Sequence, residues 1–211
     1  MQYIGPVHPT NYAEIRYPIN FVVLHTMVGW LAGSTATFVK PYTQSAHYAI
    51  DLSGNEYQWL GEQYSAYATG DWDCNLESVS VEHEDGGNYN GTRPDALYTA
   101  SAELVRDICQ RTGVPIVRGE YPLVPGIIDH RTVSATACPD ALDTDRIIRE
   151  AAGMTESQMA ELKAFISAQT NITVQAAIAI ALRQMRGTNP GLAGNDQPLV
   201  IGEKIFQTDA K

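Results

Sequence analysis

The sequence lacks any apolar run long enough to cross a bilayer, and it is poor in basic residues. Its most apolar stretches, such as Ile19 to Leu24 and Ala176 to Leu182, are much shorter than the about 20 residues that a membrane helix needs. Lys and Arg together number 14 against 24 for Asp and Glu, which gives a net charge of −10. Proteins that bind a nucleic-acid backbone present clustered basic side chains, so this composition argues against a nucleic-acid partner as well as against membrane insertion.

Cysteine is scarce, and no export signal is visible. The three cysteines, Cys74, Cys109 and Cys138, cannot all pair within one chain, so at least one is free or binds a ligand. Cys109 falls beside Val105 and Ile108 in an apolar helical pattern and is expected in the core, whereas the state of Cys74 stays open. The N-terminus has neither a basic start nor an apolar run before a small-residue cleavage site, so we expect no secretory signal peptide.

Short β-branched runs alternate with helical periodicities along the first part of the chain. The pattern predicts strands at Ile19–Leu24, Ser45–Asp51, Glu56–Leu60, Ser78–Glu82 and Val114–Val117, and helices at Ala96–Thr112 and Leu142–Ala151. The second and third strands are expected to form a hairpin through the turn Ser53–Asn55. Strands interleaved with helices predict an α/β domain, with a mixed central β-sheet flanked by helices.

A boundary is expected at Gly153, which divides the chain into a domain at 1–152 and a segment at 153–211. Thr155 to Gln158 has the pattern of a capping box, and a helix of about 15 residues is expected to follow it. A second helix is predicted from Thr173 to Arg186, with apolar residues around much of its circumference. We therefore expect a small helical C-terminal segment.

Three residues that suit a metal ion fall at strand ends or in connecting loops. His25, His130 and Cys138 offer two imidazoles and one thiolate, a set that suits Zn²⁺ and leaves a fourth tetrahedral position open, as catalytic zinc sites do. Spacing alone leaves a second interpretation open, in which they are unrelated histidines and a buried cysteine, because no short metal-binding motif such as Cys-x-x-Cys is present.

Separate sequence blocks add context to these three residues. They are Phe21 to Thr26, Ser45 to Asp51, Val79 to Glu82, His130-Arg131 and Ala137-Cys138-Pro139. In order and separation, the blocks resemble the zinc N-acetylmuramoyl-L-alanine amidases of the type 2 family, which includes phage endolysins and peptidoglycan recognition proteins. The resemblance extends roughly from Asn20 to Ala151.

The resemblance implies that His25, His130 and Cys138 bind zinc. It also implies that the protein hydrolyses the bond between the lactyl group of N-acetylmuramic acid and L-alanine in bacterial peptidoglycan. Glu82 matches an acidic residue that several phage members carry near the metal, where it acts as general base and then protonates the leaving amine. Glu84 is a weaker rival for this role, and an ordinary strand-end carboxylate is the structural alternative for Glu82.

Three further residues are implied in substrate binding: His47, Trp72 and Thr136. For His47 a structural role is an equal alternative. Trp72, Tyr67 and Tyr89 fall in or near loops that are expected to flank the cleft, and for each of them ordinary packing is at least an equal alternative. Thr136 stands where many members have a Lys that stabilises the oxyanion; its hydroxyl can donate one hydrogen bond but carries no charge.

The sequence departs from the family at two other positions, and it leaves alternatives for the whole chain. Ala46 replaces a Tyr that some members have, and Ala68 replaces a histidine. A recognition module that binds peptidoglycan without cleaving it is one alternative, and an amidase of wall recycling is another, although those relatives generally have Asp where Cys138 stands. We expect a phage endolysin, made in the host cytoplasm and released to the cell wall, whose C-terminal segment binds wall, mediates oligomerisation or gives structural support. The oligomeric state stays open.

Overall fold

A six-stranded mixed sheet forms the centre of the N-terminal part of the chain. The computed structural model describes residues 1–153 and two short strands at 199–201 and 204–206. The strand order is β1-β5-β4-β7-β3-β8. The bounds are β1 Gln2–Tyr3, β3 Phe21–Thr26, β4 Tyr48–Ile50, β5 Glu56–Gln58, β7 Ser78–His83 and β8 Gly126–Asp129. A separate two-stranded sheet pairs β2, Tyr12–Ala13, with β6, Ser65–Ala66.

The four strands β4, β7, β3 and β8 run parallel to one another. On the other side of β4, β5 pairs with it as an antiparallel hairpin. All six residues of β3 are buried, as expected for a β-branched run at the centre of a covered parallel sheet. The register pairs His25 with Glu82 and Thr26 with His83. Because paired residues of neighbouring strands face the same side of a sheet, His25 and Glu82 share one face and His83 points to the other.

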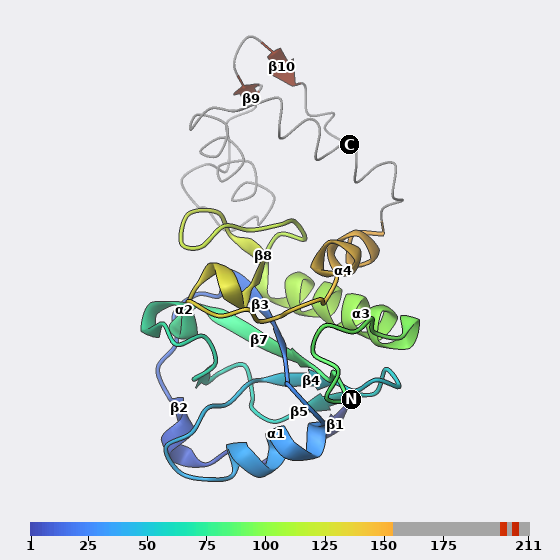
Figure 1. Cartoon of the computed structure of the whole chain (residues 1–211). Coiled ribbons are helices and arrows are strands. Elements are labelled where there is room, and N and C mark those ends of the chain that lie inside the picture. The colour runs from blue at the N-terminus through green and yellow to red at the C-terminus, as the bar shows by residue number, and fades with distance from the viewer. Residues whose placement is uncertain (154–198, 202–203, 207–211) are drawn as a thin grey trace. The chain divides into compact units, whose positions relative to one another are not determined.

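Helices cover both faces of this sheet (Figure 1). The helical segments are α1 Leu31–Phe38, α2 Trp72–Leu76, α3 Asp95–Thr112 and α4 Thr144–Ala151, with 3₁₀ turns η1 Pro9–Asn11 and η2 His130–Thr132. α3 packs against α4 and covers the face of His83, whose Nε2 lies 2.7 Å from the hydroxyl of Ser101 in α3. Phe38 at the end of α1 packs with Ala49 and Trp59 in a buried cluster on the opposite face.

These elements confirm the predicted α/β fold with a mixed central sheet and flanking helices. The hairpin, the strand at Ser78 and the helix that ends before Gly113 are found where they were expected; Gly113 adopts φ 75° and its N–H donates to the carbonyl of Cys109. α4 begins two residues later than predicted, because the carboxylate of Asp143 caps it by accepting the N–H of Arg146.

The strand predicted at Val114–Val117 is wrong. This segment contains Pro115, which has no N–H to donate to a sheet, and the backbone reaches β8 only through an isolated bridge between Arg118 and Ile127. Helices α1 and α2 were not predicted, and the same is true of the short strands β1, β2 and β6.

The chain divides into two compact units, Met1–Thr155 and Glu156–Lys211. In the second unit the structure describes β9, Leu199–Ile201, and β10, Lys204–Phe206, which pair antiparallel. The two helices predicted between Thr155 and Arg186 lie outside the described residues, and the helical character of this segment stays a prediction. Among the residues that are described, no helix combines the length and apolarity needed to cross a membrane.

Candidate metal centre

The fold brings His25, His130 and Cys138 together. His25 is the penultimate residue of β3, and His130 directly follows the neighbouring parallel strand β8. The carboxyl ends of parallel strands meet at one edge of a sheet, where loops can carry further residues to the same point. One candidate ligand atom from each of the three residues lies within 4.8 Å of the other two. The rings of His25 and His130 have centroids 4.5 Å apart, and Nδ1 of His25 lies 3.9 Å from Sγ of Cys138.

Hydrogen bonds select the tautomer of His130. Its Nε2 lies 3.0 Å from the carbonyl of Thr69 and 2.9 Å from the hydroxyl of Ser134. A carbonyl only accepts, so Nε2 carries the proton and Nδ1 keeps a lone pair for a metal. This is the arrangement in which an outer hydrogen bond orients a histidine ligand.

The donor set fits a zinc ion. Two imidazoles and a thiolate are typical zinc ligands, and tetrahedral bonds of about 2.0–2.3 Å place such donors about 3.3–3.7 Å apart. The separation between Nδ1 of His25 and Sγ of Cys138 is close to this range. Nε2 of His25 is buried and has no hydrogen-bond partner. Burial, and then the neighbouring His130, lower the pKa of His25 well below 6.5, so the ring is neutral, as a metal ligand must be.

Cys138 is buried at the same point, and its sulfur already accepts a hydrogen bond. The backbone N–H of Thr26 donates to Sγ at 3.3 Å. Burial, and then the Glu82 carboxylate, raise the pKa of the thiol to about 12. A cation bound to the sulfur opposes this effect and favours the thiolate. The other two cysteines, Cys74 and Cys109, are buried away from this cluster, which confirms Cys109 as a core residue.

Glu82 lies beside His25 on the neighbouring strand and faces the same side of the sheet. One of its carboxylate oxygens, Oε2, is buried without a hydrogen-bond partner. Burial raises the pKa of this carboxyl to about 8. A carboxyl with a pKa near neutrality can both accept and return a proton, which suits a general base.

The acidic rival Glu84 has a different task. Its two carboxylate oxygens accept the backbone N–H groups of Leu31 at 2.8 Å and Leu52 at 3.0 Å, so they hold the start of α1 and the turn after β4. His83, between the two glutamates, is packed in the interior, where Nδ1 lies 2.8 Å from the carbonyl of His25. These contacts favour Glu82 over Glu84 as the group that faces the metal residues.

His47 is buried, and backbone groups occupy both of its ring nitrogens. Nδ1 accepts the N–H of Ser80 at 3.1 Å, and Nε2 lies 3.1 Å from the carbonyl of Tyr64. Burial lowers the pKa of His47 to about 3, so the ring is neutral. Of the two roles considered for this residue, the contacts favour the structural one; substrate binding stays a prediction.

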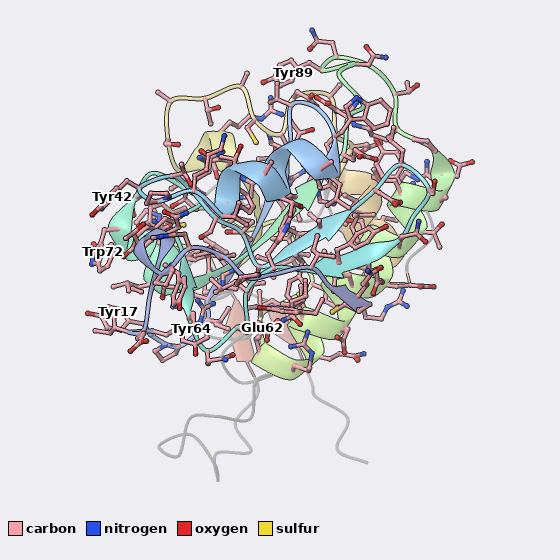
Figure 2. The ribbon with its side chains drawn as sticks, turned by 90° about the horizontal axis from the view of Figure 1, so that it is seen from below. Tyr17, Tyr42, Glu62, Tyr64, Trp72 and Tyr89 are labelled. Carbon is pink, nitrogen blue, oxygen red and sulfur yellow. The ribbon has the colours of Figure 1, made fainter. Side chains whose placement is uncertain are left out.

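Trp72 and Thr136 are accessible. Trp72 opens α2, is 52% exposed and lies 5.8 Å, ring to ring, from Tyr67. It projects outward on the same side as Tyr42, while Tyr89 lies at a distant loop (Figure 2). Thr136 is exposed, and its Oγ1 accepts the N–H of Cys138 at 3.2 Å, which leaves the hydroxyl proton free to be donated.

The two alanines that depart from the family pattern occupy constrained places. Ala46 is wholly buried in the cluster that contains Phe38 and Trp59, so a larger ring there requires that cluster to rearrange. Ala68 is half-buried, and its N–H donates to Oδ1 of Asn75 at 3.1 Å. Ala46 therefore serves local packing, whereas Ala68 is held through its backbone.

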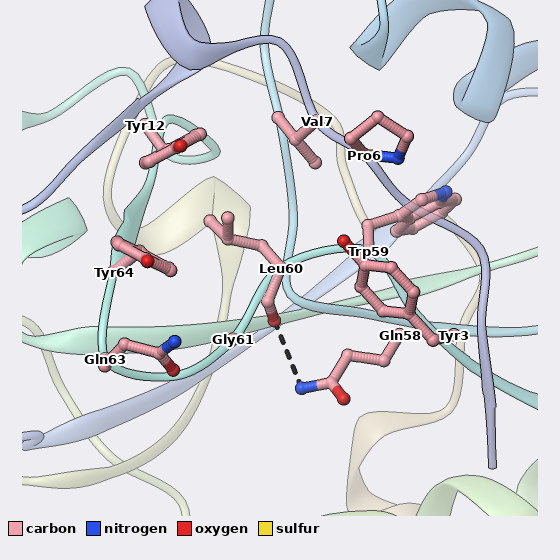
Figure 3. A pocket seen from close by; sticks show the side chains of 10 residues that line it. All are labelled: Tyr3, Pro6, Val7, Tyr12, Gln58, Trp59, Leu60, Gly61, Gln63 and Tyr64. Carbon is pink, nitrogen blue, oxygen red and sulfur yellow. Dashed lines mark hydrogen bonds between the residues drawn. The ribbon is translucent and has the colours of Figure 1, made fainter.

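Two surface depressions lie in this unit. A groove of about 600 Å³ begins at Met27, two residues after His25, and is lined by Val28 and Trp30, which are 67% and 58% exposed. A second pocket, of about 320 Å³, lies among Tyr3, Tyr12, Tyr64 and Trp59, where the amide of Gln58 donates to the carbonyl of Leu60 (Figure 3). Neither lining includes His25, His130 or Cys138, and the groove at Met27 is the one that follows His25 directly in the chain.

Sequence reasoning missed residues that contact the three candidate ligands or their neighbours in the chain. The carbonyl of Thr69 lies 3.0 Å from Nε2 of His130, and a buried ion pair joins Arg93 to Asp140, the second residue after Cys138. A backbone carbonyl has no sequence signature, and the members of the pair are 47 residues apart. The exposed Trp30 in the groove was also missed, because the helix that follows it was not predicted.

The sequence is similar to a family and to a curated protein that are both described as N-acetylmuramoyl-L-alanine amidases. Residues 15–141 match the model of the family described as N-acetylmuramoyl-L-alanine amidase. N-acetylmuramoyl-L-alanine amidase A of Achromobacter lyticus is 35% identical over 116 residues, which are 52% of this chain and 62% of that protein. The chain therefore spans less than two thirds of the length of this relative.

Solved structures share the fold. N-acetylmuramoyl-L-alanine amidase LysC from Clostridium intestinale URNW superposes with a TM-score of 0.55 at 15% identity, over 73% of this chain and 97% of that one. The PlyG catalytic domain superposes with a TM-score of 0.59 at 18% identity, over 72% of this chain and 93% of that one.

Proposed function

Because the chain belongs to the N-acetylmuramoyl-L-alanine amidase family, we propose that it hydrolyses the amide bond between N-acetylmuramic acid and L-alanine in bacterial peptidoglycan. The observation that carries this proposal is the convergence of His25, His130 and Cys138, with Glu82 beside them. We assign the three residues as ligands of a Zn²⁺ ion. Zinc bound there supplies a Lewis acid that polarises the scissile carbonyl and lowers the pKa of water to about 7.

The protein's own groups move the protons. Glu82 takes a proton from the attacking water while the oxygen of that water bonds to the carbonyl carbon. Glu82 then returns the proton to the amine nitrogen as the C–N bond breaks. One water is consumed, and the products are a lactyl carboxylate and a stem peptide with a free L-alanine amine. The hydroxyl of Thr136 donates to the oxygen that becomes negative, since its own acceptor side already holds the N–H of Cys138.

The groove at Met27 supports a place for the substrate. It starts directly beside the β3 end that carries His25, and its exposed Trp30 offers an aromatic face on which a sugar ring or an apolar stem residue can pack. Val28 has φ 51°, which is unusual for a β-branched residue, and backbone strain of this kind clusters at functional sites. We assign this groove, together with Trp72, to substrate binding.

Mass spectrometry of digested wall tests the proposed reaction. Purified peptidoglycan is incubated with the protein, with and without a zinc chelator, and His25→Ala serves as the matched control. We expect chelator-sensitive release of stem peptides that begin with L-alanine. If the protein binds zinc and sediments with wall that remains intact, it acts as a recognition module, which is the alternative function that the sequence leaves open.

We further propose that the protein is an endolysin, made in a host cytoplasm and released to the wall. The likeness to the PlyG catalytic domain and to LysC supports this origin through the fold only. Expression inside a bacterium tests it: we expect lysis only when a pore-forming protein is expressed as well. Lysis by the protein alone contradicts dependence on a separate release step.

A further inference from the structure

Arg93 connects the two segments that carry His25 and Cys138, although it lies in neither. Its side chain is 1% exposed, and its guanidinium pairs at 2.9 Å with the carboxylate of Asp140, whose side chain is 0% exposed. Nη2 of the same guanidinium donates to Oγ1 of Thr26 at 3.2 Å. Thr26 directly follows His25, and Asp140 is the second residue after Cys138. A single nitrogen therefore spans both ligand-bearing segments.

Thr26 links Arg93 to the sulfur of Cys138. Its backbone N–H donates to Sγ of Cys138 at 3.3 Å, and its hydroxyl donates to the carbonyl of His83 at 3.2 Å. The hydroxyl oxygen in turn accepts from Arg93. A shift of Arg93 therefore displaces the residue that donates to the cysteine sulfur.

Asp140 fixes the other side of the connection. Its φ is 56°, in the left-handed region, and its Oδ1 accepts the N–H of Leu142 at 3.1 Å. The carbonyl of Asp140 accepts from the side chain of Arg131 at 2.6 Å, and the carbonyl of Cys138 accepts the N–H of Arg131 at 2.8 Å. The turn after Cys138 is thus held at several points, with the carboxylate turned toward Arg93.

The second terminal nitrogen of Arg93, Nη1, binds the loop that precedes α3, whereas Nε is buried without a hydrogen-bond partner. Nη1 donates to the carbonyls of Asn88, at 3.3 Å, and Gly91, and Nη2 also reaches the carbonyl of Tyr89 at 3.4 Å. Only a planar guanidinium with several fixed donors can serve these acceptors together with Asp140. A lysine keeps the charge and loses this geometry.

We propose that Arg93 is a positioning residue for the metal centre, which with Thr26 and Asp140 fixes the distance between the end of β3 and the turn that carries Cys138. The inference rests on the proposed function, since it requires zinc at the three ligands. A buried ion pair contributes little net stability compared with apolar residues of similar size, so its value here is the geometry that it imposes. Loss of a group that orients a metal ligand typically weakens metal binding about 10- to 100-fold.

Zinc affinity of the full chain tests this proposal. Thr26→Val removes the hydroxyl that accepts from Arg93 and keeps the backbone N–H, whereas Thr26→Ser retains the hydroxyl. Competition with a chromophoric chelator measures the affinity, and the thiolate-to-metal absorption of the Co²⁺-loaded protein reports the bond to Cys138. We expect about 10- to 100-fold weaker zinc binding and an altered Co²⁺ spectrum in Thr26→Val and Arg93→Lys, and near wild-type values in Thr26→Ser.

Arg106→Lys is the matched control. Arg106 is a half-buried arginine that donates to the carbonyls of Ala151 and Glu150 and touches no metal residue. We expect this variant to lower the free energy of unfolding and leave zinc affinity unchanged. Asp140→Asn, which tolerates the same backbone conformation, gives a second route if Arg93→Lys does not fold.

The outcomes separate this inference from the proposed function. Wild-type affinity and spectra in Thr26→Val together with Arg93→Lys or Asp140→Asn overturn the positioning role and leave the zinc site intact. Equal weakening in Arg106→Lys also overturns it, since the effect then follows stability alone. A wild-type protein that binds neither metal refutes the zinc site itself.

Discussion

Replacing Glu82 by Gln is expected to reduce hydrolysis and to stabilise the metal-free protein at neutral pH. The stability effect comes from the burial of this carboxyl, and the effect on hydrolysis comes from the loss of its proton transfers. Oε2 of Glu82 is buried without a hydrogen-bond partner, so the change to an amide of the same shape breaks no hydrogen bond at this atom. Urea unfolding of the variant therefore shows whether a loss of activity is accompanied by a loss of structure.

The stability effect follows from the raised pKa. Burial moves the pKa of Glu82 from 4.5 to about 8, so its contribution to stability is fully present below pH 4.5 and is lost as the pH rises through 8. At pH 7 the unfolded chain has released this proton and the folded chain still holds it. At about 1.4 kcal/mol per pH unit, the resulting penalty is about 3 kcal/mol. The neutral amide in the Glu82→Gln variant carries no such penalty.

The effect on activity follows from the proton transfers. General acid–base catalysis by one side chain contributes about 10²- to 10⁴-fold, which corresponds to about 3 to 5 kcal/mol of the activation barrier. We expect kcat for stem-peptide release to fall by this factor in Glu82→Gln. Zinc affinity is expected to remain within a few-fold of wild type, since Glu82 is assigned no metal bond.

Glu84→Gln is a control for which we expect the opposite pattern, lower stability with retained activity. Both oxygens of Glu84 accept backbone N–H groups, from Leu31 and Leu52, and an amide can accept only one of them. This variant should lose about 1 to 3 kcal/mol of stability and retain most of its activity at a temperature where it is folded. Stability is measured by urea unfolding of metal-free protein at pH 5 and pH 7, and activity by product analysis. Undiminished kcat in Glu82→Gln refutes its role as base, and lower stability than wild type at pH 7 refutes the burial argument.

Three further predictions concern residues around the centre. Trp30→Ala should raise KM about 2- to 10-fold with little change in kcat, whereas Tyr3→Ala, which removes a similarly exposed ring from the other pocket, should leave the kinetics unchanged. Thr136→Val should lower kcat about 10-fold and Thr136→Lys should raise it, because a hydroxyl donor is lost in one and a cation is added in the other; steady-state kinetics on soluble muropeptides measure both. The pKa of His47 is lowered by burial from 6.5 to about 3, so its contribution to stability is present above pH 6.5 and lost as the pH falls toward 3. Urea unfolding of metal-free His47→Gln should show a weaker loss of stability over this interval than wild type does, and an equal loss contradicts the assignment.

Much of the fold was predictable because local patterns and tertiary packing agree. The β-branched run of β3 is buried on both faces, and Gly113 supplies the left-handed residue that ends α3. Helix α1 was not predictable on these grounds, since it contains Gly33, Ser34 and two threonines, which are weak helix formers. Its start depends on Glu84, whose carboxylate accepts the N–H of Leu31 from 53 residues away.

The metal residues were predictable for a different reason. Spacing alone left two interpretations open for His25, His130 and Cys138, and the resemblance of their sequence blocks to the amidases singled them out. His25 and His130 lie at the ends of neighbouring parallel strands, and Cys138 reaches the same edge of the sheet from a turn. Arg93 and Asp140 are ordinary charged residues in the sequence, and only the folded chain shows that both are buried and paired. Their role depends on a distance that no local pattern encodes.

The hydrogen bond from His130 to Thr69 depends on the backbone and not on the side chain of Thr69. The acceptor is a backbone carbonyl, so Thr69→Ala leaves it in place and the tautomer of His130 unchanged. The side chain of Thr69 instead contacts Asn75, whose Oδ1 also accepts the N–H groups of Ala68 and Thr69. Replacing Asn75 therefore disturbs the carbonyl that orients His130 more than replacing Thr69 does. In a scan of single substitutions we therefore expect the effect on His130 at Asn75, although Asn75 contacts neither the three candidate ligands nor the groove at Met27.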